Sequence, residues 1–200
     1  MIVPAGKINF MSQVFANLIF QSFLAYSSAR AVIENQEMSR QVMENSLLLF
    51  LSMVVLLLVL SFMRLQTSMK FIVFSILSVV VGALMSSLRT FDDEALKEAL
   101  ASTIGIFVVM FMAGVISTQF KIDMVPVALG LFALYLITLF VSFFKKGSSR
   151  VFVPIFALFI LVETNLMLRK NYQGDFVNGS LSYFSDIINL FSNLLEWNED

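Results

Sequence analysis

The sequence contains no cysteine and no histidine, and only 14% of its 200 residues are charged. Without cysteine, disulfide and thiolate chemistry are excluded and the redox compartment is undetermined. Without histidine, the chain lacks the usual general base, the usual haem ligand and the ligand of most zinc sites. A formal net charge of -1 argues against a nucleic-acid partner. We therefore expect no enzyme, no cofactor and no certain metal site.

Apolar residues dominate what is present. They make up 58% of the chain, with phenylalanine used 22 times, whereas soluble domains carry about a quarter charged residues. The charges separate apolar runs long enough to cross a hydrocarbon core, which takes about 20 helical residues. Only helices and closed barrels satisfy their backbone in lipid, and these runs lack the alternation of barrel strands. The sequence predicts an all-α membrane protein with one transmembrane domain over residues 1–200.

Seven segments are candidate transmembrane spans, with short connections that favour antiparallel neighbours in an up-and-down bundle. The predicted spans are residues 8–32, 46–63, 71–88, 100–118, 124–144, 151–168 and 179–197. If the first segment crosses, six lysine and arginine residues lie on one side of the membrane and seven on the other. The positive-inside rule therefore does not decide the orientation.

The last of these segments has two interpretations. Residues 179–197 carry an apolar face and an equally regular polar stripe at helical spacing. A helix lying flat on the membrane surface would explain this pattern, but the polar stripe has no lysine or arginine to hold anionic headgroups. A seventh crossing, with the polar stripe turned toward the bundle interior, is the alternative that we favour.

Two acids lie clearly within predicted spans, where an ionisable residue costs at least about 2.5 kcal/mol on insertion scales. Glu163 comes shortly before its span ends, and Asp186 shortly after the next span begins. Antiparallel neighbours would therefore hold the two carboxyls at similar depth. Arg64, at the end of the second predicted span, reaches the same membrane face if the first segment crosses.

Such a cluster has definite physical consequences. Two carboxyls in one site of low dielectric cannot both ionise cheaply, so they would titrate as a coupled unit. An arginine bound in one state and released in another would turn proton occupancy into a conformational bias. The competing interpretation is a structural ion pair that ties three helices together. We favour the sensor, because a structural tie needs one acid and this site has two.

The C-terminal third contains two informative motifs, SYFSDIINLF at residues 182–191 and ETN at residues 163–165. They resemble motifs of the Bax inhibitor-1 family, in which the first corresponds to the signature of the seventh span and the second to the Asp-Thr-Gln motif at the end of the sixth. Residues 118–123, TQFKID, resemble the family's Thr-Lys-x-Asp loop. The resemblance extends from about residue 63 to residue 197 and is weak before it.

This resemblance implies seven helices with a central C-terminal helix surrounded by six others. It also implies a pH-sensitive calcium leak, with a role in suppressing cell death in eukaryotic members. Glu163, Asp186 and Arg64 would form the pH sensor and gate, with Thr164, Asn165 and Asn189 as supporting polar residues. Calcium would be the transported ion. The chain departs from the pattern with Glu163 for Asp, Asn165 for Gln and an acidic C-terminus, so the pH window and any function of a basic tail do not carry over.

The alternative function is a non-conducting membrane protein that regulates other proteins or belongs to a membrane assembly. An intramembrane aspartyl hydrolase is disfavoured because its Gly-x-Gly-Asp type of motif is missing. The expected partners are the lipid bilayer, calcium ions and other membrane proteins. A bacterial inner membrane, a eukaryotic organelle membrane and a viral membrane all fit the sequence.

Overall fold

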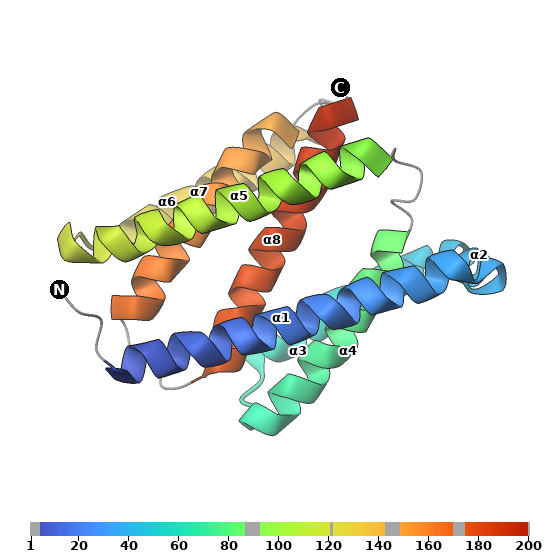
Figure 1. The fold of residues 1–200 in the computed structure, drawn as a ribbon, viewed down its shortest axis with the longest axis horizontal. Helices are drawn as coiled ribbons and strands as arrows, with labels where there is room; N and C mark the ends of the chain where they lie inside the picture. Colours follow the sequence, from blue (N-terminus) through green and yellow to red (C-terminus); the bar gives the residue numbers. More distant parts are fainter. Residues whose placement is uncertain (1–4, 87–92, 121, 143–148, 170–174, 200) are drawn as a thin grey trace. The chain divides into compact units, whose positions relative to one another are not determined.

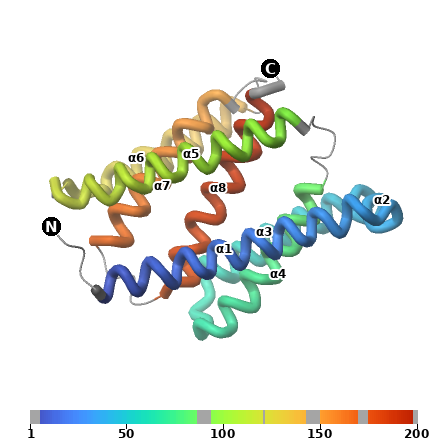
Figure 2. The backbone as a smooth tube through the Cα atoms, in the orientation of Figure 1, coloured from blue at the N-terminus to red at the C-terminus, as the bar shows by residue number. Residues whose placement is uncertain are grey.

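The computed structural model describes residues 5–86, 93–120, 122–142, 149–169 and 175–199; the remainder is grey in Figure 2. Every element within these ranges is helical, which confirms the predicted all-α class. The elements shown in Figure 1 are α1 (Ala5–Glu34), α2 (Gln36–Glu44), α3 (Ser46–Phe62), α4 (Thr67–Met85), α5 (Asp93–Ser117), the 3-10 helix η2 (Thr118–Phe120), α6 (Val125–Ser142), α7 (Ser149–Arg169) and α8 (Phe176–Glu199).

Five of the described helices are long and apolar enough to cross a membrane: α1, α4, α5 with η2, α6 and α7. The helix α3 passes this test only together with α2, from which it is bent by 73°, and would bring the number to six. The helix α8 is 24 residues long but is not among them. Several crossings make the chain a multi-pass integral membrane protein, while the seventh crossing stays a prediction.

The boundaries of the helices differ most from the predicted spans in two places. Residues 36–44, taken as a connection, form the helix α2, because Asn35 caps it by accepting hydrogen bonds from the backbone N–H groups of Glu37 (3.0 Å) and Met38 (3.1 Å). The helix α5 begins at Asp93, upstream of the predicted span 100–118. The ends of two predicted spans, residues 87–88 and 143–144, lie outside the described residues.

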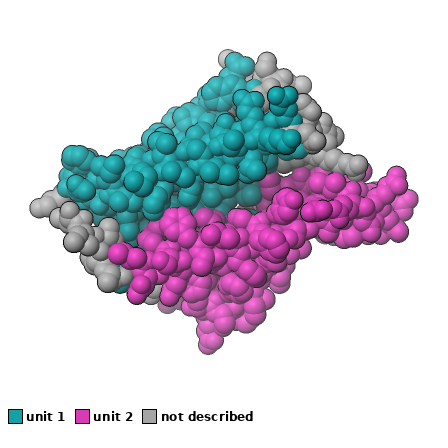
Figure 3. All heavy atoms as spheres, in the orientation of Figure 1, with its two compact units in different colours: residues 1–7, 91–173, 182–200 teal, residues 8–90, 174–181 magenta. Residues whose placement is uncertain are grey.

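The chain divides into two compact units, coloured separately in Figure 3. Unit 1 comprises residues 1–7, 91–173 and 182–200, and unit 2 comprises residues 8–90 and 174–181. The helix α8 therefore contributes its first turns to unit 2 and the rest of its length to unit 1.

In unit 1, α7 packs against both α5 and α6. Its membrane-length segment is 61% buried, against 17% for α5 and 11% for α6, so α7 is the core helix of this unit. Met124, just before α6, and Leu131 of α6 pack with Val162 of α7 in a buried apolar cluster. Tyr135 adds edge-on contacts to the rings of Phe152 (5.8 Å) and Phe156 (5.7 Å).

In unit 2, α4 contacts α3 and also lies against α1. The α1–α4 approach depends on Gly82, because a β-carbon there would lie 2.8 Å from the carbonyl carbon of Ala25. Glycine permits such close helix packing, which drives association in lipid. The stacked rings of Phe20 and Phe71, 5.5 Å apart, extend the same contact.

Candidate functional site

Two neighbouring helices of unit 1 bring the predicted acids together. Glu163 lies on α7 and Asp186 on α8, and their carboxyl groups are close enough to interact with each other. The Ser182 side chain, one turn before Asp186, also interacts with Glu163. The site is thus built from one acid on α7 and one face of α8.

Each acid of this pair has a side-chain oxygen that lacks a hydrogen-bond partner among the described residues. Asp186 is 7% exposed. Within the described part of the chain, Glu163 Oε2 and Asp186 Oδ2 are both buried without a hydrogen-bond partner. Two negative charges held this close, in a buried site, are costly unless something neutralises them. A proton or a cation would therefore lower the energy of the site.

Beside the acids, a hydroxyl pair joins α7 to α8. Thr164 Oγ1 donates to the carbonyl of Ile160 (2.7 Å) and lies 2.7 Å from the hydroxyl of Tyr183. Because the threonine has only one proton, the Tyr183 hydroxyl is the donor to Thr164. Both residues are fully buried. The ring of Phe107, on α5, meets the ring of Tyr183 edge-on at 5.4 Å.

The third helix, α5, approaches this region closely through a glycine. A β-carbon at Gly114 would lie 2.6 Å from Thr164 Cβ and 2.7 Å from the Leu161 carbonyl oxygen. One turn later, Ser117 Oγ accepts a hydrogen bond of 2.7 Å from Asn165 Nδ2. Asn165 Oδ1 is buried and has no partner among the described residues. Of the two predicted supporting residues on α7, Thr164 therefore contacts both α5 and α8, and Asn165 contacts α5.

The other predicted site residues lie elsewhere. Arg64 is exposed in the connection between α3 and α4 and belongs to unit 2, whereas the acids belong to unit 1. Asn189 is exposed on α8, and its backbone carbonyl accepts a hydrogen bond of 2.7 Å from Asn193 Nδ2. The structure thus groups Glu163 and Asp186 with Thr164 and Asn165 nearby.

Two residues of this region, Ser182 and Tyr183, were not predicted as site residues. Both precede Asp186, by four and three positions, and so lie on its side of the helix. That spacing is the signal that could have identified them. Among the described residues no group of three or more His, Cys, Asp or Glu side chains could hold a metal ion.

A second buried polar cluster lies in unit 2 and contains no charge. The Gln21 side chain donates to Asn17 Oδ1 (3.2 Å) and Ser75 Oγ (3.2 Å), and it accepts from Ser78 Oγ (2.9 Å). Asn17 donates in turn to Ser180 Oγ at the beginning of α8. We call these five residues the amide cluster. It joins α1 to α4 and to the first turns of α8.

The fold and the acid pair define a multi-pass helical membrane protein with an acidic pair buried between two of its helices. A family model described as inhibitor of apoptosis-promoting Bax1 matches residues 7–197. The chain therefore belongs to the Bax inhibitor-1 family, which confirms the resemblance predicted from its C-terminal motifs. The match extends through both units and includes residues 7–45, where the motifs are weak. No curated protein matches the chain.

Proposed function

We propose that this protein is a pH-sensitive calcium leak of the Bax inhibitor-1 type, without enzymatic activity or a resident cofactor. The observation that carries the proposal is the acid pair Glu163 and Asp186, whose buried, unpartnered oxygens Oε2 and Oδ2 favour binding of a proton or a cation. Membership of the family supports it independently. The family's association with Bax makes an accompanying role in suppressing cell death part of the same proposal.

In this mechanism, protonation of the acid pair removes its charge and changes how α7 and α8 pack. Arg64 acts as the latch that holds the closed arrangement, and α8 is the seventh crossing, the central helix of the bundle. The burial of Asp186, Tyr183 and Leu190 on α8 supports a helix enclosed by protein rather than one lying on a surface. Thr164 and Tyr183 would keep the two helices in register while the acids titrate.

The proposal is tested with purified protein in vesicles that contain a calcium-sensitive dye. We expect a calcium flux that changes with external pH, and we expect Asp186→Asn and Glu163→Gln to remove the pH response. Glu196→Gln, on the exposed end of the same helix, is the matched control and should behave as the unmodified protein. Arg64→Gln should increase the flux under conditions where the unmodified protein is closed.

Two outcomes would contradict this proposal. One is a flux no greater than that of protein-free vesicles at every pH, which would favour the non-conducting alternative. The other is an Asp186→Asn variant whose flux and pH response match those of the unmodified protein. The second outcome would leave a leak but remove the acid pair from its mechanism.

A further inference from the structure

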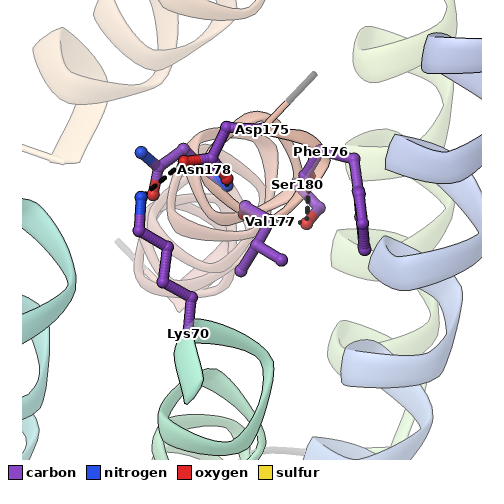
Figure 4. Close-up of polar contacts among 6 residues, drawn as sticks. All are labelled: Lys70, Asp175, Phe176, Val177, Asn178 and Ser180. Carbon is purple, nitrogen blue, oxygen red and sulfur yellow. Dashed lines mark hydrogen bonds and ion pairs between the residues drawn. The ribbon is translucent and has the colours of Figure 1, made fainter. Parts of the chain in front are cut away.

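An ion pair joins the beginning of α4 to the residue just before α8. Lys70 Nζ, in the first turn of α4, donates to Asp175 Oδ2 (Figure 4). The two side chains are 11% and 24% exposed. The other ion pairs among the described residues, Arg30–Glu34 and Arg40–Glu44, lie within one helix and are more than half exposed. Among the ion pairs of the described residues, Lys70–Asp175 is thus the one that joins two different parts of the chain.

Asp175 also caps α8. Its Oδ1 accepts the backbone N–H of Asn178 at 3.1 Å, and its carbonyl accepts the N–H of Gly179 at 3.3 Å. A carboxylate at a helix N-terminus satisfies backbone donors and interacts favourably with the helix dipole. One carboxylate oxygen therefore binds α8 itself, while the other binds the lysine of α4. This double role fixes the beginning of α8 in unit 2.

Other contacts in unit 2 hold the same turns of α8. Val177 is fully buried, and Ser180 accepts the hydrogen bond from Asn17 of α1. Asp186 follows Asp175 by eleven residues, about 16 Å along one continuous helix. A helix transmits a displacement of its first turn along its length, so the anchoring of this turn affects where Asp186 lies.

We propose that Lys70 and Asp175 are positioning residues for the acid pair. Their ion pair holds the beginning of α8 on α4 and thereby sets how Asp186 meets Glu163. The functional part of this inference rests on the proposed leak. We call this ion pair the anchor. A separate measurement tests whether it holds the beginning of α8 on α4.

The first test measures the pH profile of the flux in four variants. Asp175→Asn removes the charge and keeps the cap, because Asn and Asp are equally good N-cap residues. Lys70→Gln removes the other charge. We expect both to move the midpoint of the profile in the same direction by about half a pH unit, with no further shift in the double variant. Lys70→Arg should keep the midpoint of the unmodified protein.

A stabilising ion pair without a positioning role gives a different result. Lys70→Gln and Asp175→Asn would then lower the thermal stability and leave the midpoint of the flux unchanged. That result overturns the proposal. Unequal shifts that add in the double variant also overturn it, because the two residues would then act separately.

The second test does not need a flux. Because the chain has no cysteine, Lys70→Cys with Asp175→Cys creates its only thiol pair. A short bismaleimide should join these thiols faster than it joins Cys at the exposed Ser68 to Cys at 175, since residues 68 and 70 lie on different faces of α4. Equal rates overturn the anchor. If the unmodified protein gives no flux at any pH, the leak proposal fails and this cross-linking alone decides the anchor.

Discussion

The two units each bury a polar cluster between helices, and the clusters differ in charge and in pairing. The amide cluster of unit 2 uses amides and hydroxyls, and its hydrogen bonds satisfy both ends of the Gln21 side chain. The cluster of unit 1 contains two acids, and three of its buried oxygens have no partner: Glu163 Oε2, Asn165 Oδ1 and Asp186 Oδ2. None of the five residues of the amide cluster is unsatisfied in this way.

This difference separates stabilising groups from functional ones. An unsatisfied polar group in a membrane interior costs several kcal/mol, about as much as leaving it bare in any apolar medium. Polar groups that are paired recover this cost and hold helices together. Groups that are left unpaired at a buried site lower the stability, and such groups concentrate where a ligand or proton binds. The amide cluster belongs to the first kind, and we propose that the acid pair belongs to the second.

The largest effects are expected where glycines let the helices around each cluster approach. Gly82→Ala and Gly114→Ala place a β-carbon against the backbone of Ala25 and against Thr164, which should cost about 1–3 kcal/mol or more. Gly105→Ala is the control, since nothing lies within 4 Å of its β-carbon. Thermal unfolding in detergent measures all three. Equal stability of the three variants would show that close approach does not support either cluster.

The next largest effect should come from Gln21→Leu, which removes the centre of the amide cluster. Asn17 Oδ1 then loses its donor, whereas Ser75 and Ser78 keep their hydrogen bonds to the carbonyls of Phe71 and Phe74. A buried acceptor left unsatisfied costs about 1–3 kcal/mol. Gln13→Leu, at an exposed position of the same helix, is the matched control and should be neutral. The flux and its pH dependence should persist in whatever fraction of the protein folds. A Gln21→Leu protein as stable as the control would show that the amide cluster does not stabilise the fold.

The sequence predicted where the helices lie better than which helices contact one another. Apolar runs predicted the helices, because crossing lipid requires an internally hydrogen-bonded backbone of fixed length. The helix α2 was missed because it is short and polar, and its main local signal is the cap at Asn35. Membership of the Bax inhibitor-1 family was predictable because its motif in residues 182–191 is dense.

The two clusters were not equally predictable from the sequence. Depth along adjacent helices was enough to expect Glu163 near Asp186, because α7 and α8 follow each other in the chain. Asn17 and Gln21 were visible only as polar interruptions of the first predicted span. Their partners Ser75 and Ser180 lie far away in the sequence, and nothing local indicates which helix faces which. Long-range pairing is the part that spacing does not encode.

Neutralising the acids should have the opposite effect on stability to removing the centre of the amide cluster by Gln21→Leu. We expect Asp186→Asn and Glu163→Gln to leave the thermal stability unchanged or to raise it by up to about 1 kcal/mol, while the pH response of the flux is lost. The reason is that the carboxyls lose a repulsive neighbour and give up no complete set of hydrogen bonds. A loss of stability as large as that of Gln21→Leu would instead identify the acids as a structural tie.

The smallest effect is expected for Tyr183→Phe, a change inside unit 1 that removes one satisfied hydrogen bond beside the acids. Thr164 keeps its bond to the Ile160 carbonyl, and the ring of residue 183 keeps its contact with Phe107, while the hydroxyl pair of Tyr183 and Thr164 is lost. Hydrogen bonds between membrane helices contribute about 0.6 kcal/mol on average, and we expect a destabilisation of that size. Thermal unfolding measures it, and Tyr135→Phe, in the aromatic contacts of α6 and α7, is the comparison variant. If Tyr183→Phe removes the pH response while Tyr135→Phe does not, the distinction between paired stabilising groups and unpaired functional groups is wrong, because a paired hydroxyl would then belong to the sensor.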